Sequence, residues 1–386
     1  MKKVLSCLFL LVLTIASAQI NINSGEILEK NYYTKIPYRI VNGLIIIEVE
    51  INAVKHDFLL DTGAITTLFS KFRSSDFKQD IAIPIKDSQN NIKELTTLTI
   101  NQFKIAGLTF QNIPSLLEHE DNIISDCFNV DGIIGSNAFR NSVIEFNFDK
   151  SEIIVTNDVK NLDLKKGKPL KFTMESKQNS PIFFIAHSGK KTVQNTILFD
   201  TGYKGFYMIT SKSYDAFKEY HVFQKEIIGK GINSYGLFGS EAESDKKRIL
   251  IPDLQIGNTT IENIWTETSN DNISKLGVDL LHYGTAIIDY SKKKFYFISN
   301  ASKLPYKNTI WPISPNFKDG KLVVGALCDT YLNKANLGDE IISIDTIETK
   351  VSSICDLITD PILKKKSILK LKKNTGEIYT VEMDKL

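Results

Sequence analysis

The sequence has 386 residues, of which 42% are hydrophobic. This is enough to bury the cores of two or three ordinary domains, and it argues against a disordered chain. There are 47 Lys and Arg against 45 Asp and Glu, but Lys2 and Lys3 lie in a leader that we expect to be removed, which leaves a net charge of zero. Because nucleic-acid-binding proteins normally carry a basic excess, we expect no nucleic-acid partner.

The N-terminus has the three regions of a secretory signal peptide. Lys2 and Lys3 precede an apolar run over residues 4–15, and Ala16-Ser17-Ala18 follows it. We expect a signal peptide at residues 1–18 and a mature protein that is exported, either to the periplasm or out of the cell. No later stretch approaches the roughly 18 consecutive apolar residues of a membrane helix, so we expect no transmembrane segment in the mature protein.

The next elements in chain order form an internal repeat of β-hairpins, each followed by Asp-Thr-Gly. The first copy comprises strands at 44–51 and 57–60 and then Asp61-Thr62-Gly63, and the second comprises strands at 181–186 and 196–199 and then Asp200-Thr201-Gly202. One such triplet arises by chance in roughly a tenth of chains of this length. Two in matching contexts are poorly explained by coincidence.

Each copy then continues to a glycine in an apolar setting. These segments are Ile133-Ile134-Gly135 and Lys275-Leu276-Gly277, and each leads into further short strands separated by Asn, Asp, Gly and Lys turns. Short β-branched or alternating strands of this kind are typical of an all-β barrel or sandwich. We therefore predict a mainly β fold with two pseudo-symmetric β lobes, at residues 37–160 and 168–299.

A third unit, residues 306–386, is predicted as a small α+β domain. The pattern predicts strands at 322–327, 340–344, 368–371 and 378–383 and a helix at 352–363. The segment from Ala335 to Asp345, with Leu337-Gly338-Asp339 before an apolar strand, resembles the PDZ signature. That resemblance implies a domain that binds a peptide ligand by strand addition. A purely structural or regulatory role stays open.

Three cysteines remain after removal of the leader, Cys127, Cys328 and Cys355. An odd and small number argues against a disulfide framework, although export permits disulfides. Two alternatives stay open for Cys328 and Cys355: a disulfide between them, or buried free thiols. The five histidines lack the close His/Cys spacings of a zinc site, so we predict no metal.

Two aspartates on matching loops suggest a paired-carboxylate site. Carboxyl groups a few ångströms apart cannot both ionise cheaply, so they share one proton and can act as a base and an acid toward water and an amide carbonyl. Thr62 and Thr201 offer hydroxyls that can tie one loop to the other. Gly63 and Gly202 permit tight turns and a close approach to the opposing aspartate.

With these motifs, residues 37–299 resemble the bilobal aspartic proteases, and Asp61-Thr62-Gly63-Ala64 with Ile133-Ile134-Gly135 is most similar to the retropepsin-like branch. The resemblance implies a single-chain, monomeric protease with catalytic residues Asp61 and Asp200, one from each lobe. Thr62, Gly63, Thr201 and Gly202 would support this dyad. The family uses one water and no cofactor.

The resemblance also implies β-hairpin flaps over a cleft. We expect the flap tips at Asp87–Asn91 and at Gly229–Gly239, and we expect Ala64, Tyr203 and Tyr235 to bind substrate. The sequence departs from the family at Tyr203, where a small residue is usual, and at Lys275, where an apolar residue is usual.

The leading hypothesis is therefore an exported aspartic endopeptidase acting on protein or peptide substrates, with a C-terminal PDZ-like domain. The alternative hypothesis belongs to a different functional class. It is a non-catalytic exported peptide-binding protein that retains the protease fold, and it predicts peptide affinity without cleavage that depends on the two aspartates.

Overall fold

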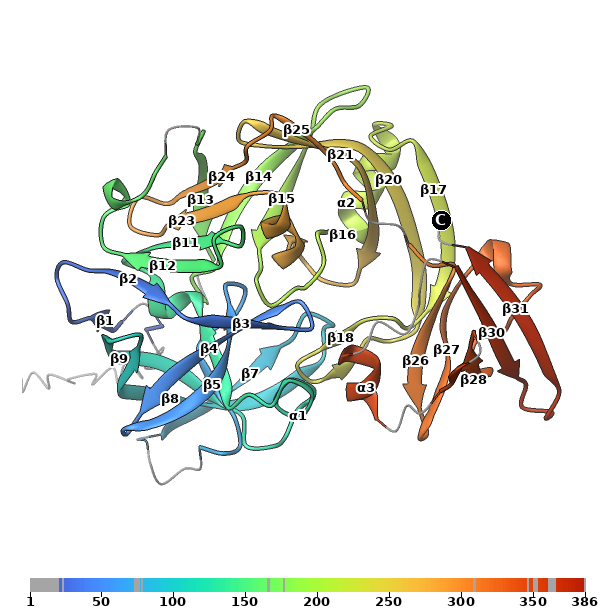
Figure 1. Cartoon of the computed structure of the whole chain (residues 1–386), viewed down its shortest axis with the longest axis horizontal. Helices are drawn as coiled ribbons and strands as arrows, with labels where there is room; N and C mark the ends of the chain where they lie inside the picture. Colours follow the sequence, from blue (N-terminus) through green and yellow to red (C-terminus); the bar gives the residue numbers. More distant parts are fainter. Residues whose placement is uncertain are drawn as a thin grey trace, which may run out of the picture.

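The computed structural model describes residues 21, 22, 24–72, 77, 79–164, 167–175, 178–307, 310–345, 347–349, 353–359 and 366–384. The predicted signal peptide, residues 1–18, lies outside this part of the chain. The described residues form a mainly β protein, as the sequence predicts (Figure 1). The α-helices among them are α1 (Ile123–Phe128), α2 (Ser211–Glu219) and α3 (Ile354–Thr359), and the 3-10 helices are η1 (Ser136–Phe139), η2 (Val159–Asn161), η3 (Val278–His282) and η4 (Asp329–Tyr331).

The first copy of the repeat folds into one sheet, with strand order β1-β9-β6-β10-β5-β4-β8-β7 and β3 paired to β4. Its strands are β1 (Glu26–Ile27), β3 (Tyr38–Val41), β4 (Leu44–Ile51), β5 (Val54–Asp61), β6 (Thr67–Leu68), β7 (Gln79–Lys86), β8 (Ile92–Ile105), β9 (Leu108–Leu117) and β10 (Gly132–Gly135). Strands β4 and β5 form the predicted hairpin, which ends at Asp61. Strand β10 runs parallel to β5 and places Gly135 opposite Asp61.

The second copy repeats this local arrangement. Its strands are β13 (Leu170–Met174), β14 (Pro181–His187), β15 (Val193–Phe199), β16 (Tyr207–Thr210), β17 (Lys225–Gly231), β18 (Tyr235–Gly236), β19 (Gly239–Ser240), β20 (Ser244–Ile256), β21 (Thr259–Ser269), β22 (Ser274–Leu276) and β25 (Lys303–Pro305). Strands β14 and β15 form the second predicted hairpin. Strand β22 runs parallel to β15 with Leu276 opposite Phe199, and η3 follows it as η1 follows β10.

A sheet with strands from both copies joins them. It contains β2 (Tyr33–Ile36), β11 (Val143–Asn147), β12 (Glu152–Thr156), β23 (Thr285–Asp289) and β24 (Lys294–Ile298). Strand β11 pairs with β23, while β2 extends the sheet beyond β12 and β13 extends it beyond β24. One buried apolar cluster runs through both copies, and in it the Phe199 ring lies 6.0 Å from Phe146 and 5.1 Å from Phe295. Such close packing fixes the two Asp-Thr-Gly loops relative to each other.

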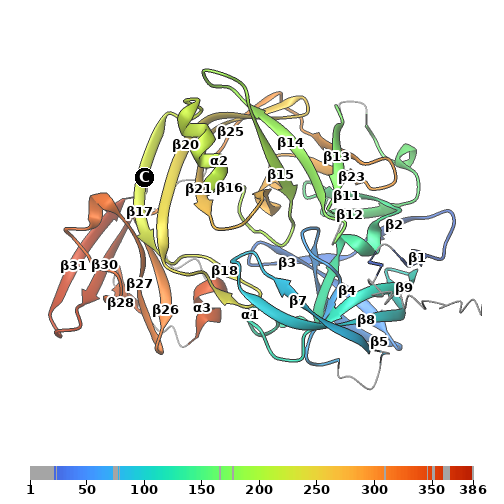
Figure 2. The same ribbon diagram turned by 180° about the vertical axis from the view of Figure 1, so that it is seen from behind.

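The C-terminal module, residues 310–384, has its own apolar core. Its strands are β26 (Ile313–Lys318), β27 (Lys321–Cys328), β28 (Glu340–Ile344), β29 (Ile347–Glu348), β30 (Lys366–Lys372) and β31 (Ile378–Asp384). The four strands predicted here are confirmed, and the described helix is α3. Strand β27 also pairs with β17 of the second copy, with Gly229 opposite Cys328 and Gly231 opposite Ala326. Figure 2, the view from behind, shows β17 alongside the strands of the module.

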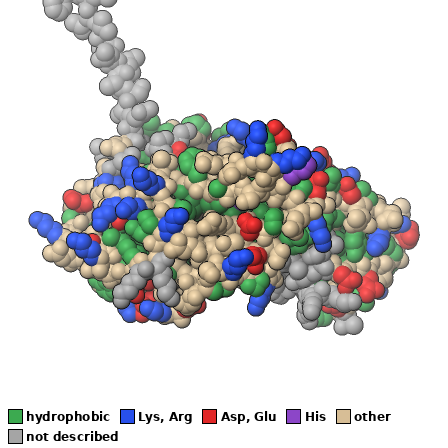
Figure 3. All heavy atoms as spheres, turned by 90° about the horizontal axis from the view of Figure 1, so that it is seen from above, with side chains coloured by type: hydrophobic (Ala, Val, Ile, Leu, Met, Phe, Trp, Pro, Cys, Tyr) green, Lys and Arg blue, Asp and Glu red, His purple; other side chains and the backbone are tan. Residues whose placement is uncertain are grey.

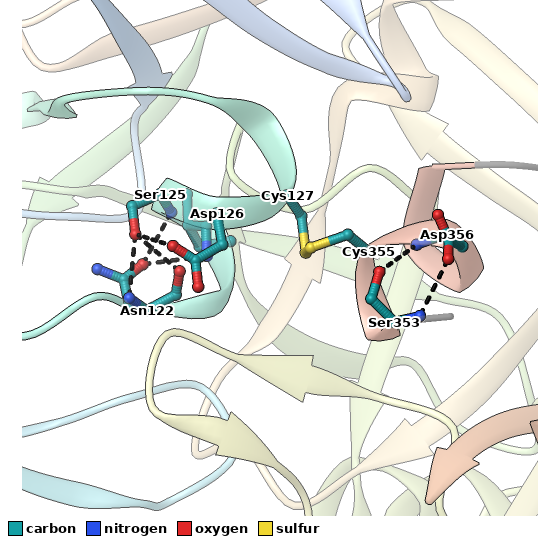
Figure 4. The surroundings of a disulfide bond; sticks show 8 residues. Asn122, Ser125, Asp126, Cys127, Ser353, Cys355 and Asp356 are labelled. Atoms are coloured by element: carbon teal, nitrogen blue, oxygen red, sulfur yellow. Dashed lines mark hydrogen bonds between the residues drawn. A yellow bond between two sulfur atoms is a disulfide. The ribbon is translucent and has the colours of Figure 1, made fainter. Parts of the chain in front are cut away.

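A disulfide joins the C-terminal module to the first copy of the repeat. Cys127 near the end of α1 pairs with Cys355 on α3, across 228 residues of sequence (Figure 4). The suggested pairing of Cys328 with Cys355 is therefore wrong, and Cys328 is a buried free thiol. Cys328 ends β27 and accepts a hydrogen bond from Arg248 Nη1 at 2.7 Å, whereas α3 packs against α1. The alternative of a buried free thiol is thus confirmed for Cys328 alone.

Charged side chains of both signs are interspersed over the face seen in Figure 3, in keeping with the balanced composition. Within the described residues, none of the helices has the length and apolar character needed to cross a bilayer.

Candidate active site

The two Asp-Thr-Gly loops bind each other through their threonines. Thr62 N donates to Thr201 Oγ1 at 3.0 Å, and Thr201 N donates to Thr62 Oγ1 at 3.0 Å. Each hydroxyl then donates across to the strand before the other loop: Thr62 Oγ1 to Phe199 O and Thr201 Oγ1 to Leu60 O, both at 2.7 Å. Since both threonines are buried, these four hydrogen bonds lock the loops in a symmetric, face-to-face arrangement.

This arrangement makes the Thr62 hydroxyl a strong contributor to stability. Thr62→Val keeps the shape of the side chain but leaves Phe199 O without its donor and Thr201 N without its acceptor. An unsatisfied buried group costs roughly 1–3 kcal/mol, so we expect the free energy of unfolding to fall by about 3 kcal/mol in urea denaturation. Thr62→Ser retains the hydroxyl and should lose about 1 kcal/mol or less. Equal losses in the two variants would contradict this role.

The glycines of the triplets bring the carboxyl groups close to the opposing loops. Gly63 N donates to Asp61 Oδ1 at 2.7 Å, and Gly202 N donates to Asp200 Oδ1 at 2.9 Å. A Cβ on Gly63 would lie 2.6 Å from the Asp200 carboxyl, and a Cβ on Gly202 would lie 2.2 Å from Asp61 Oδ2. Both positions therefore exclude any side chain while the carboxyl groups stay where they are.

The pKa of Asp61 is raised well above its ordinary value. Burial is the largest cause, and the negative charge of the neighbouring Asp200 and a hydrogen bond between the two carboxyl groups act in the same direction. Gly63 N–H and the charge of Lys275 oppose the rise. The neutral form of the Asp61 carboxyl group therefore persists above the pH range that is usual for aspartate.

Lys275 ion-pairs directly with the dyad. Its Nζ lies 2.9 Å from Asp200 Oδ2 and 2.9 Å from Asp271 Oδ2, and the whole residue is only 8% exposed. Burial alone would lower the pKa of this ammonium group, but the charges of Asp200 and Asp271 more than reverse that effect and raise it. Lys275 is therefore a buried cation at the candidate active site.

The two predicted flap tips touch each other. Asp87 shapes the turn between β7 and β8 by accepting from Gln89 N and Asn91 N, both at 2.9 Å. Gln89 Nε2 donates to Ser234 Oγ at 2.9 Å, and Phe238 N donates to Asp87 Oδ2 at 2.9 Å. Hydrogen bonds thus connect segments that are about 150 residues apart in sequence.

The first-copy tip also reaches the loop that carries the partner of Lys275. Asn90 Nδ2 donates to Asn270 O at 2.5 Å, and Asn270 is followed directly by Asp271. The tip at Asp87–Asn91 therefore contacts the residue that directly precedes Asp271, one of the two carboxylate partners of Lys275.

The three residues predicted to bind substrate have other contacts. Ala64 O accepts from Ser136 N at 3.1 Å, and its side chain packs on an apolar cluster. Tyr203 folds back over its own loop, since a Cβ on Gly205 would lie 2.3 Å from its hydroxyl oxygen. The Tyr235 hydroxyl donates to Asn316 Oδ1 on β26, and burial raises its pKa to about 12.

Some residues that contact the loops were not predicted from the sequence. Ser136 Oγ donates to Thr62 O at 2.6 Å and also meets Tyr290 Oη at 2.8 Å, while Gln178 Nε2 donates to Gly63 O at 2.7 Å. Ser136 directly follows Gly135, so its position after the Ile-Ile-Gly segment was a usable signal. Gln178 comes from a distant turn, and no local pattern distinguishes it.

Within the described part of the chain, no group of three or more His, Cys, Asp or Glu side chains is arranged to hold a metal ion. No protein-family model matches this sequence, and no curated protein matches it.

Proposed function

We propose that this chain is an aspartic endopeptidase in which Asp61 and Asp200 activate one water without a cofactor. The observation that carries the proposal is the reciprocal hydrogen bonding of Thr62 and Thr201, which holds together the two loops whose neighbouring carboxyl groups, Asp61 and Asp200, interact with each other. The two copies of the repeat are then the lobes of a single-chain, retropepsin-like protease, residues 37–160 and 168–299. The raised pKa of Asp61 agrees with a dyad that shares one proton.

In this mechanism the ionised carboxylate removes a proton from water as the water oxygen bonds to the amide carbon. The protonated carboxyl group gives its proton to the carbonyl oxygen, which forms a neutral tetrahedral diol. The C–N bond then breaks, the amine nitrogen receives the proton taken from water, and a diol hydroxyl returns its proton to the dyad. The products are a carboxylic acid and an amine, and the dyad regains its starting charge.

The C-terminal module is proposed to be a PDZ-like domain, residues 306–386. Strand β26 pairs with β27 along one side and packs against α3, an arrangement that favours binding of an extended peptide beside β26. Because the Tyr235 hydroxyl at the second predicted flap tip donates to Asn316 on β26, a peptide bound beside β26 would lie near that tip. With the predicted signal peptide, the proposed enzyme works in the periplasm or outside the cell.

One observation favours the alternative of a peptide-binding protein without turnover. Lys275 Nζ lies 2.9 Å from Asp200 Oδ2, so one oxygen of this carboxylate already has a partner and fewer lone pairs are left to receive a water molecule. The alternative predicts peptide affinity with no cleavage.

The test is cleavage of a diverse peptide mixture by protein that begins at Gln19, across about pH 4 to 8, beside Asp61→Asn as the matched control. Mass spectrometry of the products should find cuts that are absent with Asp61→Asn. A folded wild-type protein that binds peptides from the mixture but makes no such cuts would favour the alternative.

A further inference from the structure

Lys275 makes the surroundings of the two Asp-Thr-Gly loops unequal. In the first copy the strand beside the dyad carries Ile133-Ile134-Gly135, and Ile133 is buried. In the second copy the matching strand carries Lys275-Leu276-Gly277, so Lys275 stands where the first copy has Ile133. The two aspartates therefore have different neighbours although their threonine and glycine contacts are alike.

The consequence is an uneven distribution of charge in the dyad. Lys275 Nζ contacts Asp200 Oδ2 at 2.9 Å, with Asp271 as its second carboxylate at 2.9 Å. Asp61 receives the Gly63 N–H at 2.7 Å, and Lys275 acts on it through charge alone. A buried ammonium group in direct contact with one carboxylate favours the ionised form of that carboxylate.

We propose that Lys275 is a positioning residue that holds Asp200 as the ionised member of the dyad, so that Asp200 is the base toward water and Asp61 is the acid toward the carbonyl oxygen. This inference rests on the proposed function and assigns the roles of base and acid within it. In a symmetric dyad either aspartate can hold the proton, whereas here the contact with Lys275 places the proton on Asp61.

Other titratable groups face this cluster from neighbouring elements. Tyr203 and Tyr290 have pKa values raised above the ordinary value, chiefly by burial, so both are neutral in the acid range. Glu267 pairs with Arg248, and Asp279 accepts from the Tyr306 hydroxyl at 3.0 Å. Asp271 already contacts Lys275. Among the described residues, the cation in contact with the dyad is Lys275.

The experiment compares the pH dependence of kcat/KM for the wild type and Lys275→Met. Activity is lost on the acid side when Asp200 takes up a proton. Removing the ammonium group should therefore shift the acid limb, the low-pH side of the kcat/KM profile, to higher pH by about one unit or more. Lys275→Arg retains the charge and should leave that limb near the wild-type position. An unchanged acid limb in Lys275→Met would overturn the inference.

Lys246→Met is the matched control for loss of a buried lysine. Lys246 is 2% exposed in the same copy of the repeat and forms its ion pair with buried Glu241 instead of Asp200. The variant should lose stability, yet its acid limb should stay at the wild-type pH. An equal shift of the limb in both lysine variants would mean that Lys275 acts only through stability.

Carbon-13 NMR of the aspartate carboxyl carbons shows which aspartate is ionised without any cleavage assay. The signals of Asp61 and Asp200 are identified by their loss in Asp61→Asn and Asp200→Asn. In the wild type, the Asp61 signal should report protonation at a higher pH than the Asp200 signal, because Lys275 contacts Asp200 directly, and the reverse order would overturn the inference. Absence of dyad-dependent cuts in the wild type would instead refute the proposed function and leave this titration as the test of Lys275.

Discussion

Asp61→Asn and Asp200→Asn should each lower kcat/KM by roughly 10³-fold or more, yet they should change stability in opposite directions. The loss of activity follows because an amide can neither accept the proton of water nor donate one as a carboxylic acid. Peptide cleavage measured at the wild-type optimum tests this part. Activity within about tenfold of the wild type in either variant would contradict the proposed mechanism.

Asp61→Asn should be more stable than the wild type at neutral pH. Because the pKa of Asp61 is raised in the folded protein, the folded state binds more protons than the unfolded state above the ordinary aspartate pKa. The contribution of Asp61 to the free energy of unfolding therefore falls as pH rises from about 4 toward the raised pKa. A neutral amide removes this loss. Urea denaturation at pH 4 and pH 7 should show that the free energy of unfolding decreases less between these pH values in Asp61→Asn than in the wild type.

Asp200→Asn should be less stable than the wild type, by up to about 3 kcal/mol. The substitution leaves the buried Lys275 with Asp271 as its remaining carboxylate partner. Asp271→Asn is the matched control, since it removes the other carboxylate from the same ammonium group and lies outside the Asp-Thr-Gly loops. A gain of stability in Asp200→Asn, like that expected for Asp61→Asn, would mean that the ion pair at 2.9 Å does not hold Asp200 in its ionised form.

The hairpins that carry the aspartates could be predicted because their signal is local. Strands β4 and β15 are apolar and β-branched, and each hairpin turns at polar residues, so their pairing depends on neighbours in the chain. The matching triplets also indicated that Asp61 and Asp200 belong together. Their relative position depends instead on the sheet shared by β11 and β23, for which the sequence carries no pairing signal.

The partners of Lys275 and Cys355 could not be predicted for the same physical reason. Lys275 was recognisable as a departure from an apolar pattern, but its contact with Asp200 depends on the parallel pairing of β22 with β15. Cys328 and Cys355 lie close in sequence, which suggested a pair. Docking of α3 against α1 brings Cys355 to Cys127 instead. Side chains on different elements meet where tertiary packing places those elements.

The disulfide between Cys127 and Cys355 should contribute about 5 kcal/mol to the stability of the docked C-terminal module. It closes a loop across 228 residues, and the entropy that a cross-link removes from the unfolded chain grows with loop length. The double variant Cys127→Ser/Cys355→Ser should therefore unfold its C-terminal module at a lower urea concentration than the wild type. The module retains its own core and its pairing with β17, so it should still fold.

Tryptophan fluorescence can follow the module alone. The chain has two tryptophans: Trp311 packs on the core of the module, and Trp265 lies on β21, so Trp265→Phe leaves a single reporter in the module. In this background, dithiothreitol should lower the urea midpoint of the disulfide-bonded protein to that of the double variant and should not affect the double variant. Cys328→Ser, which keeps the cross-link, should respond to the reductant as the parent does. A midpoint that does not respond to reductant in the parent would show that β17 and β27 hold the module in place without the disulfide.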